Sequence, residues 1–250
     1  VLYASIFSTF ILGCLIVYNG LYKEVAEHIK RNFKIVFALG LINPFLYYFV
    51  LFEAYDLLPA QEAQAINYTW ALMLAFLSVI FLNQKLTIKD IVAGIICYFG
   101  VLVISTRGDI LSLNFSNFEG VLLALLSTVL WSMYWIINTK SKSKALVGVF
   151  SNFLVGLPVL IAYYFINYDF VLPEYEGLLA AFYVGTFEMG ITFLFWLKAM
   201  QNAQSTSKIA NLIFISPFLS LIFIYFILEE PIYFSTIIGL SLIRSEERRV

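Results

Sequence analysis

Long apolar stretches, separated by short polar connections, determine what this chain can fold into. A helix that crosses a bilayer needs roughly 20 apolar residues, because each adds about 1.5 Å across about 30 Å of hydrocarbon. With 62% hydrophobic and 12% charged residues, the chain has about half the charge of an ordinary soluble domain. We therefore expect an all-α, multi-pass protein of the lipid bilayer. Its nine predicted spans are 2–21, 35–55, 60–82, 88–105, 119–138, 145–167, 177–199, 207–228 and a short last one, 232–243.

The two halves of the chain share one layout. Residues 40–94 and 185–239 follow the same order of apolar runs and polar breaks, 145 residues apart. Both stretches begin and end with glycine, and Ala54 aligns with Ala199 without a gap. Few other residues are identical, so the layout itself indicates an internal duplication. Membrane transporters built from two repeats hold their substrate where the repeats meet, near the middle of the bilayer.

Positive charge alternates from one connection to the next. The connections after the even-numbered spans carry Arg107 as their single Lys or Arg. Those after spans one, three, five and seven, with the adjoining helix ends, carry eleven: Lys23, Lys30, Arg31, Lys34, Lys85, Lys89, Lys140, Lys142, Lys144, Lys198 and Lys208. Because positive connections remain on the cytoplasmic side, this set predicts the cytoplasmic face and places Val1 on the other side.

The pairing of spans predicts inverted repeats. Spans two to four pair with seven to nine, span one pairs with six, and span five has no partner. We therefore expect one more helix before Val1, giving ten spans in two five-helix repeats, and because five is odd the repeats would be inverted. The predicted organisation is a first repeat over 1–105, a connection over 106–118 and a second repeat over 119–243. Residues 244–250 resemble a translated sequencing adapter and are predicted to be a non-native tail.

Two segments resemble a known family. In ANLIFISPFLSLIFIYFILEEPIYFSTIIG, residues 210–239, Glu230 follows Pro217 by thirteen residues, and the first half contains NYTW at 67–70 and FLNQK at 81–85. The sequence resembles EamA-type carriers of the drug/metabolite transporter superfamily over residues 1–243, and its first half is similar to the branch of aromatic amino acid exporters. It departs from the family at Ala71, where a proline usually follows the tryptophan, and at Gln84, where an acidic residue usually ends the segment.

The resemblance implies a secondary carrier of the bacterial inner membrane. Such a carrier would export small metabolites, most plausibly amino acids or related amphipathic compounds, by alternating access. We expect a midplane cavity formed by spans two, three, five, seven and eight and the preceding helix. The departure at Ala71 alters the expected bend of its helix, and with it the shape of this cavity.

Glu188 is the main candidate for transport chemistry. It lies near the middle of span seven, where an ionised group costs roughly 2.5–3.5 kcal/mol. Such a carboxylate must face a cavity, find a partner or stay protonated, and each alternative is compatible with substrate binding or proton coupling. A neutral glutamate that only joins two helices is the alternative. The duplication places Asn43 at the equivalent position of span two.

Other polar and aromatic residues at similar depth are candidates for substrate binding. Asn67 and Trp70 share one helical face because they are three residues apart, and Asn211 lies at similar depth in span eight. Trp70 and Trp131 offer flat surfaces and an indole N–H to an apolar or aromatic substrate, although helix packing would explain them too. Tyr48 lies near Pro44, which frees a carbonyl of its own helix.

Several functions are disfavoured by what the sequence lacks. A formal net charge of −1 and no basic stripe argue against nucleic acid as a partner. The single histidine, His28, lies in a charged connection that we expect to be a solvated loop, so no metal or cofactor site is predicted. The spans offer no catalytic pair, which argues against an enzyme. A non-transporting membrane scaffold, or an exporter of drugs or nucleotide-sugars, remains the alternative. The substrate, transport direction, coupling ion and oligomeric state stay open.

Overall fold

The computed structural model describes residues 1–58, 63, 66–85, 87–105, 109–112, 117–141, 143–216 and 238, and most of these residues lie in helices. No strand occurs among these residues, as expected where hydrocarbon leaves backbone groups no partner but one another. In the described part of the chain, four helical stretches are long and apolar enough to cross a membrane: Tyr22–Leu57, Phe118–Lys140, Ala145–Asn167 and Tyr175–Asn202. The ninth predicted span, apart from residue 238, and the predicted tail lie outside the described residues.

The chain divides into two compact units. Unit 1 comprises Val1–Phe49 and Tyr134–Asn202, and unit 2 comprises Val50–Met133 and Ala203–Val250. Helices α3 (Tyr47–Leu57) and α7 (Phe118–Lys140) contribute residues to both units.

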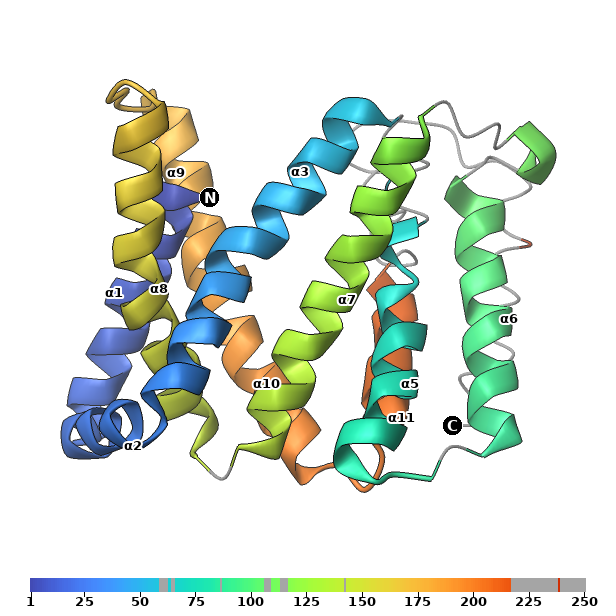
Figure 1. Ribbon diagram of the computed structural model, residues 1–250, viewed down its shortest axis with the longest axis horizontal. Helices are drawn as coiled ribbons and strands as arrows, with labels where there is room; N and C mark the ends of the chain where they lie inside the picture. The colour runs from blue at the N-terminus through green and yellow to red at the C-terminus, as the bar shows by residue number, and fades with distance from the viewer. Residues whose placement is uncertain are drawn as a thin grey trace. The chain divides into compact units, whose positions relative to one another are not determined.

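Unit 1 is built around α8, which packs against α1 and α2 (Figure 1). Besides the parts of α3 and α7, its elements are α1 (Leu2–Tyr18), α2 (Tyr22–Gly40), η1 (Leu41–Leu46), α8 (Ala145–Asn167), α9 (Tyr175–Tyr183), η3 (Val184–Thr192) and α10 (Phe193–Asn202). Its aromatic core centres on Trp135, whose ring lies 5.3 Å from that of Phe193 and 6.4 Å from that of Trp196. This core joins α7 to α10, helices that are far apart in the sequence.

The connection that contains His28 is a helix and not the solvated loop that its charges predicted. Helix α2 begins at Tyr22 and buries Val25 against Ile16 and Val147, with Ile29 packed beside them. This apolar face at helical spacing explains why the segment folds. The helix kinks at Asn32 (φ −122°, ψ 25°). In Figure 1 its first turns are viewed nearly end-on, whereas α1 and α8 run up the view. A charged segment before the kink is thus followed by an apolar one after it.

Two glycines of unit 1 allow close helix contacts. A Cβ added at Gly40 would lie 2.6 Å from the carbonyl O of Asn152 and 2.9 Å from the backbone N of Gly156. A Cβ added at Gly185 would lie 2.8 Å from the Cβ of Phe7 and still closer to the carbonyl O of Ala4. Such contacts are typical of membrane helices, where small residues let backbones approach. Gly40 and Gly185 are the glycines that open the two aligned stretches.

Unit 2 contains α5 (Trp70–Leu82), α6 (Ile88–Ser105), η2 (Ile110–Ser112), α11 (Thr206–Asn211) and η4 (Leu212–Ile215), with the remainder of α3 and α7. Helix α11 packs against both α5 and α6. Helix α5 ends at Asn83, which adopts the left-handed conformation (φ 54°) that asparagine tolerates.

Gln84, one of the two departures from the family pattern, stabilises the start of α11. Its Oε1 accepts hydrogen bonds from the backbone N–H of Thr206 at 2.9 Å and from the Thr206 hydroxyl at 2.8 Å. Backbone donors in the first turn of a helix have no partner within the helix, so a side-chain acceptor is favourable there. A carboxylate at this position would accept the same two hydrogen bonds. The glutamine can therefore perform the same structural role as the acidic residue that it replaces.

We predict that Gly40→Ala and Gly185→Ala each lower the free energy of unfolding by about 1–3 kcal/mol, because the added methyl group meets backbone that cannot shift alone. Gly13→Ala is the matched control on α1, since the nearest atom to its Cβ would be a movable ring carbon of Phe150 at 3.3 Å. Thermal unfolding in detergent measures the effect. Equal melting temperatures for all three variants would contradict the prediction.

We predict that Gln84→Ala destabilises unit 2 by about 1 kcal/mol, the usual effect of losing a helix cap. Gln84→Glu should retain the stability, because its carboxylate can accept both bonds beside the positive end of the helix. Hydrogen exchange of the first turn of α11 tests both variants. Faster exchange in Gln84→Glu than in Gln84→Ala would show that the two hydrogen bonds are not what stabilises this turn.

Candidate substrate and proton site

Two widened helical segments carry Asn43 and Glu188. In η1 and η3 the backbone hydrogen bonds span five residues instead of four, which makes the helix wider. Asn43 itself leaves the helical conformation (φ −141°, ψ 120°), as the proline that follows it favours. The 145-residue offset that aligns the two halves also superposes η1 on the centre of η3. Widened turns of this kind often occur at functional sites.

The carboxyl group of Glu188 has a tyrosine partner. The hydroxyl of Tyr48 donates a hydrogen bond to Glu188 Oε1 at 3.5 Å, which is long for such a bond. Tyr48 is buried, whereas the Glu188 side chain is exposed. The bond connects the first turn of α3 to η3, so two candidates that are 140 residues apart lie together in unit 1.

Asn43 is the least satisfied polar side chain of the predicted set. It is 0% exposed, and neither its Nδ2 nor its Oδ1 has a hydrogen-bond partner in the part of the chain that the structure describes. A buried amide without partners costs on the order of 1–3 kcal/mol. An amide kept in such a place is a candidate for contact with a ligand.

The four remaining candidates lie in unit 2. The Trp70 and Trp131 rings meet edge to face with centroids 6.4 Å apart. Asn67 Nδ2 donates to Ser127 Oγ at 3.1 Å, and Ser132 Oγ donates to the Trp70 carbonyl O at 2.9 Å. Asn67 and Trp70 therefore both contact α7. Asn211 Oδ1 would lie 3.6 Å from a Cβ added at Gly94, which places this amide beside α6. Thus unit 1 contains Asn43 and the hydrogen-bonded pair Tyr48 and Glu188, and unit 2 contains the two tryptophans with Asn67 and Asn211.

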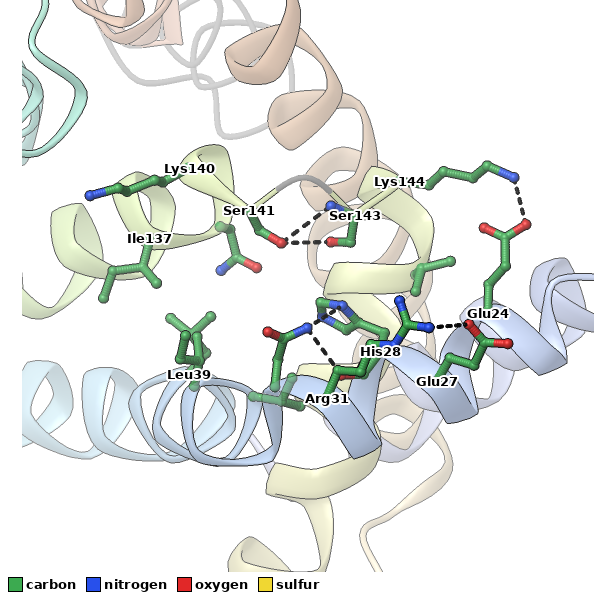
Figure 2. A pocket seen from close by; sticks show the side chains of 15 residues that line it. Glu24, Glu27, His28, Arg31, Leu39, Ile137, Lys140, Ser141, Ser143 and Lys144 are labelled. Carbon is green, nitrogen blue, oxygen red and sulfur yellow. Dashed lines mark hydrogen bonds and ion pairs between the residues drawn. The ribbon is translucent and has the colours of Figure 1, made fainter.

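A cavity of about 680 Å³ lies between α2 and the α7–α8 connection. Figure 2 shows α2 with Glu24, Glu27, His28 and Arg31 facing Ser141 and Ser143. Lys144 Nζ lies 2.7 Å from Glu24 Oε1, and Arg31 lies 3.6 Å from Glu27. Because these ion pairs are exposed, each is worth little stability. Sequence reasoning missed this cavity because residues 22–34 were expected to form a loop.

Gln201 of α10 forms hydrogen bonds to the connection between α7 and α8, which lies beside this cavity. Its Nε2 donates to the carbonyl oxygens of Asn138, Ser141 and Ser143 at 3.4, 3.4 and 3.1 Å. One side chain of α10 thus bonds both to the last turn of α7 and to the connection that follows it. Among the described residues, no group of three or more His, Cys, Asp or Glu side chains could hold a metal ion.

These observations define a class of protein, an integral membrane protein of apolar helices with polar groups at mid-span. The chain belongs to the EamA-like transporter family, whose model matches residues 1–106 and 118–244.

Relatives from several organisms are similar to this chain. The uncharacterized transporter YvbV of Bacillus subtilis is 25% identical over 239 residues, which cover 94% of this chain and 77% of YvbV. The aromatic amino acid exporter YddG of Ancylobacter novellus is 24% identical over 199 residues, covering 78% of this chain and 69% of YddG. A protein crystal structure, 20% identical, superposes with a TM-score of 0.79 over 98% of this chain and 86% of its own, and so has a similar fold.

We predict that Asn43→Leu leaves the melting temperature unchanged or raises it, because the substitution removes a buried amide that has no partner. If the amide contacts substrate, the variant should bind added substrate at least tenfold more weakly, a loss of about 1.4 kcal/mol in binding free energy. The substrate should then stabilise the variant less than the wild type. Thermal unfolding with and without substrate measures both effects.

Asn138→Leu is the matched control for this experiment. Asn138 is also buried, but it donates to the Tyr134 carbonyl O at 2.8 Å and accepts from Asn152 Nδ2 at 2.8 Å. The same change should therefore destabilise this position by about 1–3 kcal/mol. A comparable loss of stability in Asn43→Leu would identify Asn43 as a structural residue.

Proposed function

We propose that the protein is a secondary carrier that exports amino acids or related amphipathic compounds across the bacterial inner membrane by alternating access. Its membership of a transporter family is the starting point, and the hydrogen bond between Tyr48 and Glu188 is the observation that carries the proposal. Tyr48 lies just after the widened segment η1, and Glu188 lies within the widened segment η3. These two segments occupy equivalent positions in the aligned halves of the chain. The proposed halves are residues 1–105 and 119–243, which we take to be inverted repeats.

Glu188 is proposed to bind the coupling proton. An exposed carboxyl group at mid-span cannot face hydrocarbon in its charged form without a cost of roughly 2.5–3.5 kcal/mol. Its exposed side is therefore proposed to face a water-filled cavity through which substrate passes. In the protonated state the carboxyl can donate a hydrogen bond to substrate or to Asn43, and in the ionised state it accepts from Tyr48.

The tryptophans are proposed to select the substrate. Trp70 and Trp131 present one ring face and one ring edge, an arrangement that favours aromatic or other flat side chains. The similarity to an aromatic amino acid exporter supports this substrate class. Asn67 and Asn211 would then bind the polar end of the substrate.

Transport by the intact protein in reconstituted vesicles tests this function. We expect efflux of an aromatic amino acid to depend on pH in the wild type, and Glu188→Gln to make any remaining flux independent of pH. Glu176→Gln is the matched control, because Glu176 is an exposed acidic residue in the first turn of α9, on the same helical stretch Tyr175–Asn202. It should retain the wild-type pH profile.

Two outcomes would contradict the proposal at different points. Unchanged pH dependence in Glu188→Gln would remove Glu188 from the coupling mechanism while leaving the carrier function intact. No flux of any amino acid would remove the substrate class. In that case, flux of a drug or nucleotide-sugar would favour the other exporters, and a stable co-purifying partner would favour a scaffold.

A further inference from the structure

A line of polar side chains crosses the apolar interior of unit 1. It begins at Glu188 and Tyr48, which are hydrogen-bonded at 3.5 Å. Tyr48 and Tyr134 are buried neighbours close enough for an electrostatic influence, and Tyr134 lies close to the Asn152 amide, so these two steps of the line rest on proximity. Asn152 Nδ2 donates to Asn138 Oδ1 at 2.8 Å. We call these five residues the polar seam.

The seam ends at the charged cavity. Asn138 lines the cavity of about 680 Å³ together with Glu24, His28 and Lys144. The seam therefore runs from the mid-span carboxyl to this cavity, which lies at the end of unit 1 where α2 begins. By the placement of positive residues, this is the end expected to face the cytoplasm.

The polar groups of the seam are buried, and their burial costs folding free energy. Tyr134 is 0% exposed, Asn152 1% and Asn138 2%. Polar groups in such surroundings cost free energy unless they are paired. The Oδ1 atom of Asn152 is buried and accepts no hydrogen bond from a described residue. It can therefore accept a hydrogen bond from a water molecule.

We propose that the polar seam is the route by which protons pass between the α2 cavity and Glu188, an inference that rests on the proposed coupling role of Glu188. A hydronium ion in the cavity gives its proton to water held by the Asn138 and Asn152 amides. The Tyr134 and Tyr48 hydroxyls each accept one proton and release another, and the last proton converts the Glu188 carboxylate to the neutral acid. The tyrosines end as they began, and one water molecule replaces the hydronium ion.

The ionisable residues on the elements packed against η3 are the other groups that can exchange protons near Glu188. Tyr48 is its titratable hydrogen-bond partner, with Tyr47 beside Tyr48. The elements packed on η3 are α1, α9 and α10. Helix α1 has no charged residue, and it faces η3 with Ser8 near Gly190. The ionisable residues of these three helices are Tyr3, Cys14, Tyr18, Tyr175, Glu176, Tyr183 and Lys198, mostly toward the helix ends.

Carbodiimide labelling with a pH difference across the membrane tests the route. Dicyclohexylcarbodiimide reaches carboxyl groups from the lipid and reacts with their protonated form, so labelling of Glu188 reports which side sets its protonation. The intact protein is reconstituted in one orientation, and the pH is varied on one side at a time. In the wild type, labelling should change by up to about tenfold per pH unit on the α2 side and little with pH on the other.

Tyr134→Phe should abolish this response to pH on the α2 side, because it removes one hydroxyl and keeps the ring that packs against Trp135. Asn152→Ala should have the same effect through the amide. Ser151→Ala is the matched control, since the buried Ser151 hydroxyl bonds to the Val147 carbonyl of its own helix at 2.6 Å and lies outside the seam. Its labelling should follow the α2-side pH as in the wild type.

The outcomes separate this inference from the proposed function. Labelling that follows the pH of the opposite side, or that is unchanged in both Tyr134→Phe and Asn152→Ala, would overturn the seam while leaving Glu188 as the coupling residue. Equal labelling of the wild type and Glu188→Gln at every pH would show that Glu188 does not take up protons. That result would overturn both the seam and the coupling proposal.

Discussion

Hydrocarbon offers no partner to a polar group, and this constraint accounts for most of what the protein looks like. A helix satisfies its backbone internally, so the regular elements of the described residues are all helices, and polar side chains are few within the apolar stretches. Where the helix is irregular, backbone groups lose their regular partners and must find other ones. The two clearest departures, η1 and η3, occur where the chain also carries Asn43 and Glu188. Irregular backbone and costly polar side chains therefore coincide, as they do in transporters whose broken helices line a binding site.

The glycine contacts of unit 1 show the same correspondence between the two halves. Gly40, which precedes η1, lies against Gly156 of α8, and Gly185 at the start of η3 lies against Ala4 of α1. Because α1 and α8 correspond to the paired first and sixth predicted spans, each half contributes one close contact to the other. Reciprocal contacts of this kind are expected when two inverted repeats are related by an axis, so they support the proposal that the two halves are inverted repeats.

Sequence reasoning located the apolar helices well and the irregular features poorly. The predicted spans 88–105 and 145–167 have the bounds of α6 and α8, because long apolar runs end sharply at polar residues. The helix at 22–34 was missed because its charges outnumber its apolar residues, and only the spacing of Val25 and Ile29 indicated it. Glu188 could be singled out by its depth, and Asn43 by its place in the alignment of the two halves. The Tyr48 partner of Glu188, the widening of η3 and the role of Gln84 depend on contacts between distant segments, which no local pattern specifies.

The small side chains of α1 have a consequence for how transporters of this family change over time. A widened helix occupies more room than an ordinary one, and η3 obtains that room beside Ala4, Ser5 and Ser8, all of them buried. Larger side chains at these places would press η3 toward a regular helix and rotate Glu188 relative to Tyr48. A helix without a single charged residue would thereby adjust the proposed proton coupling of another, so coupling would differ among related transporters through substitutions that never touch the substrate.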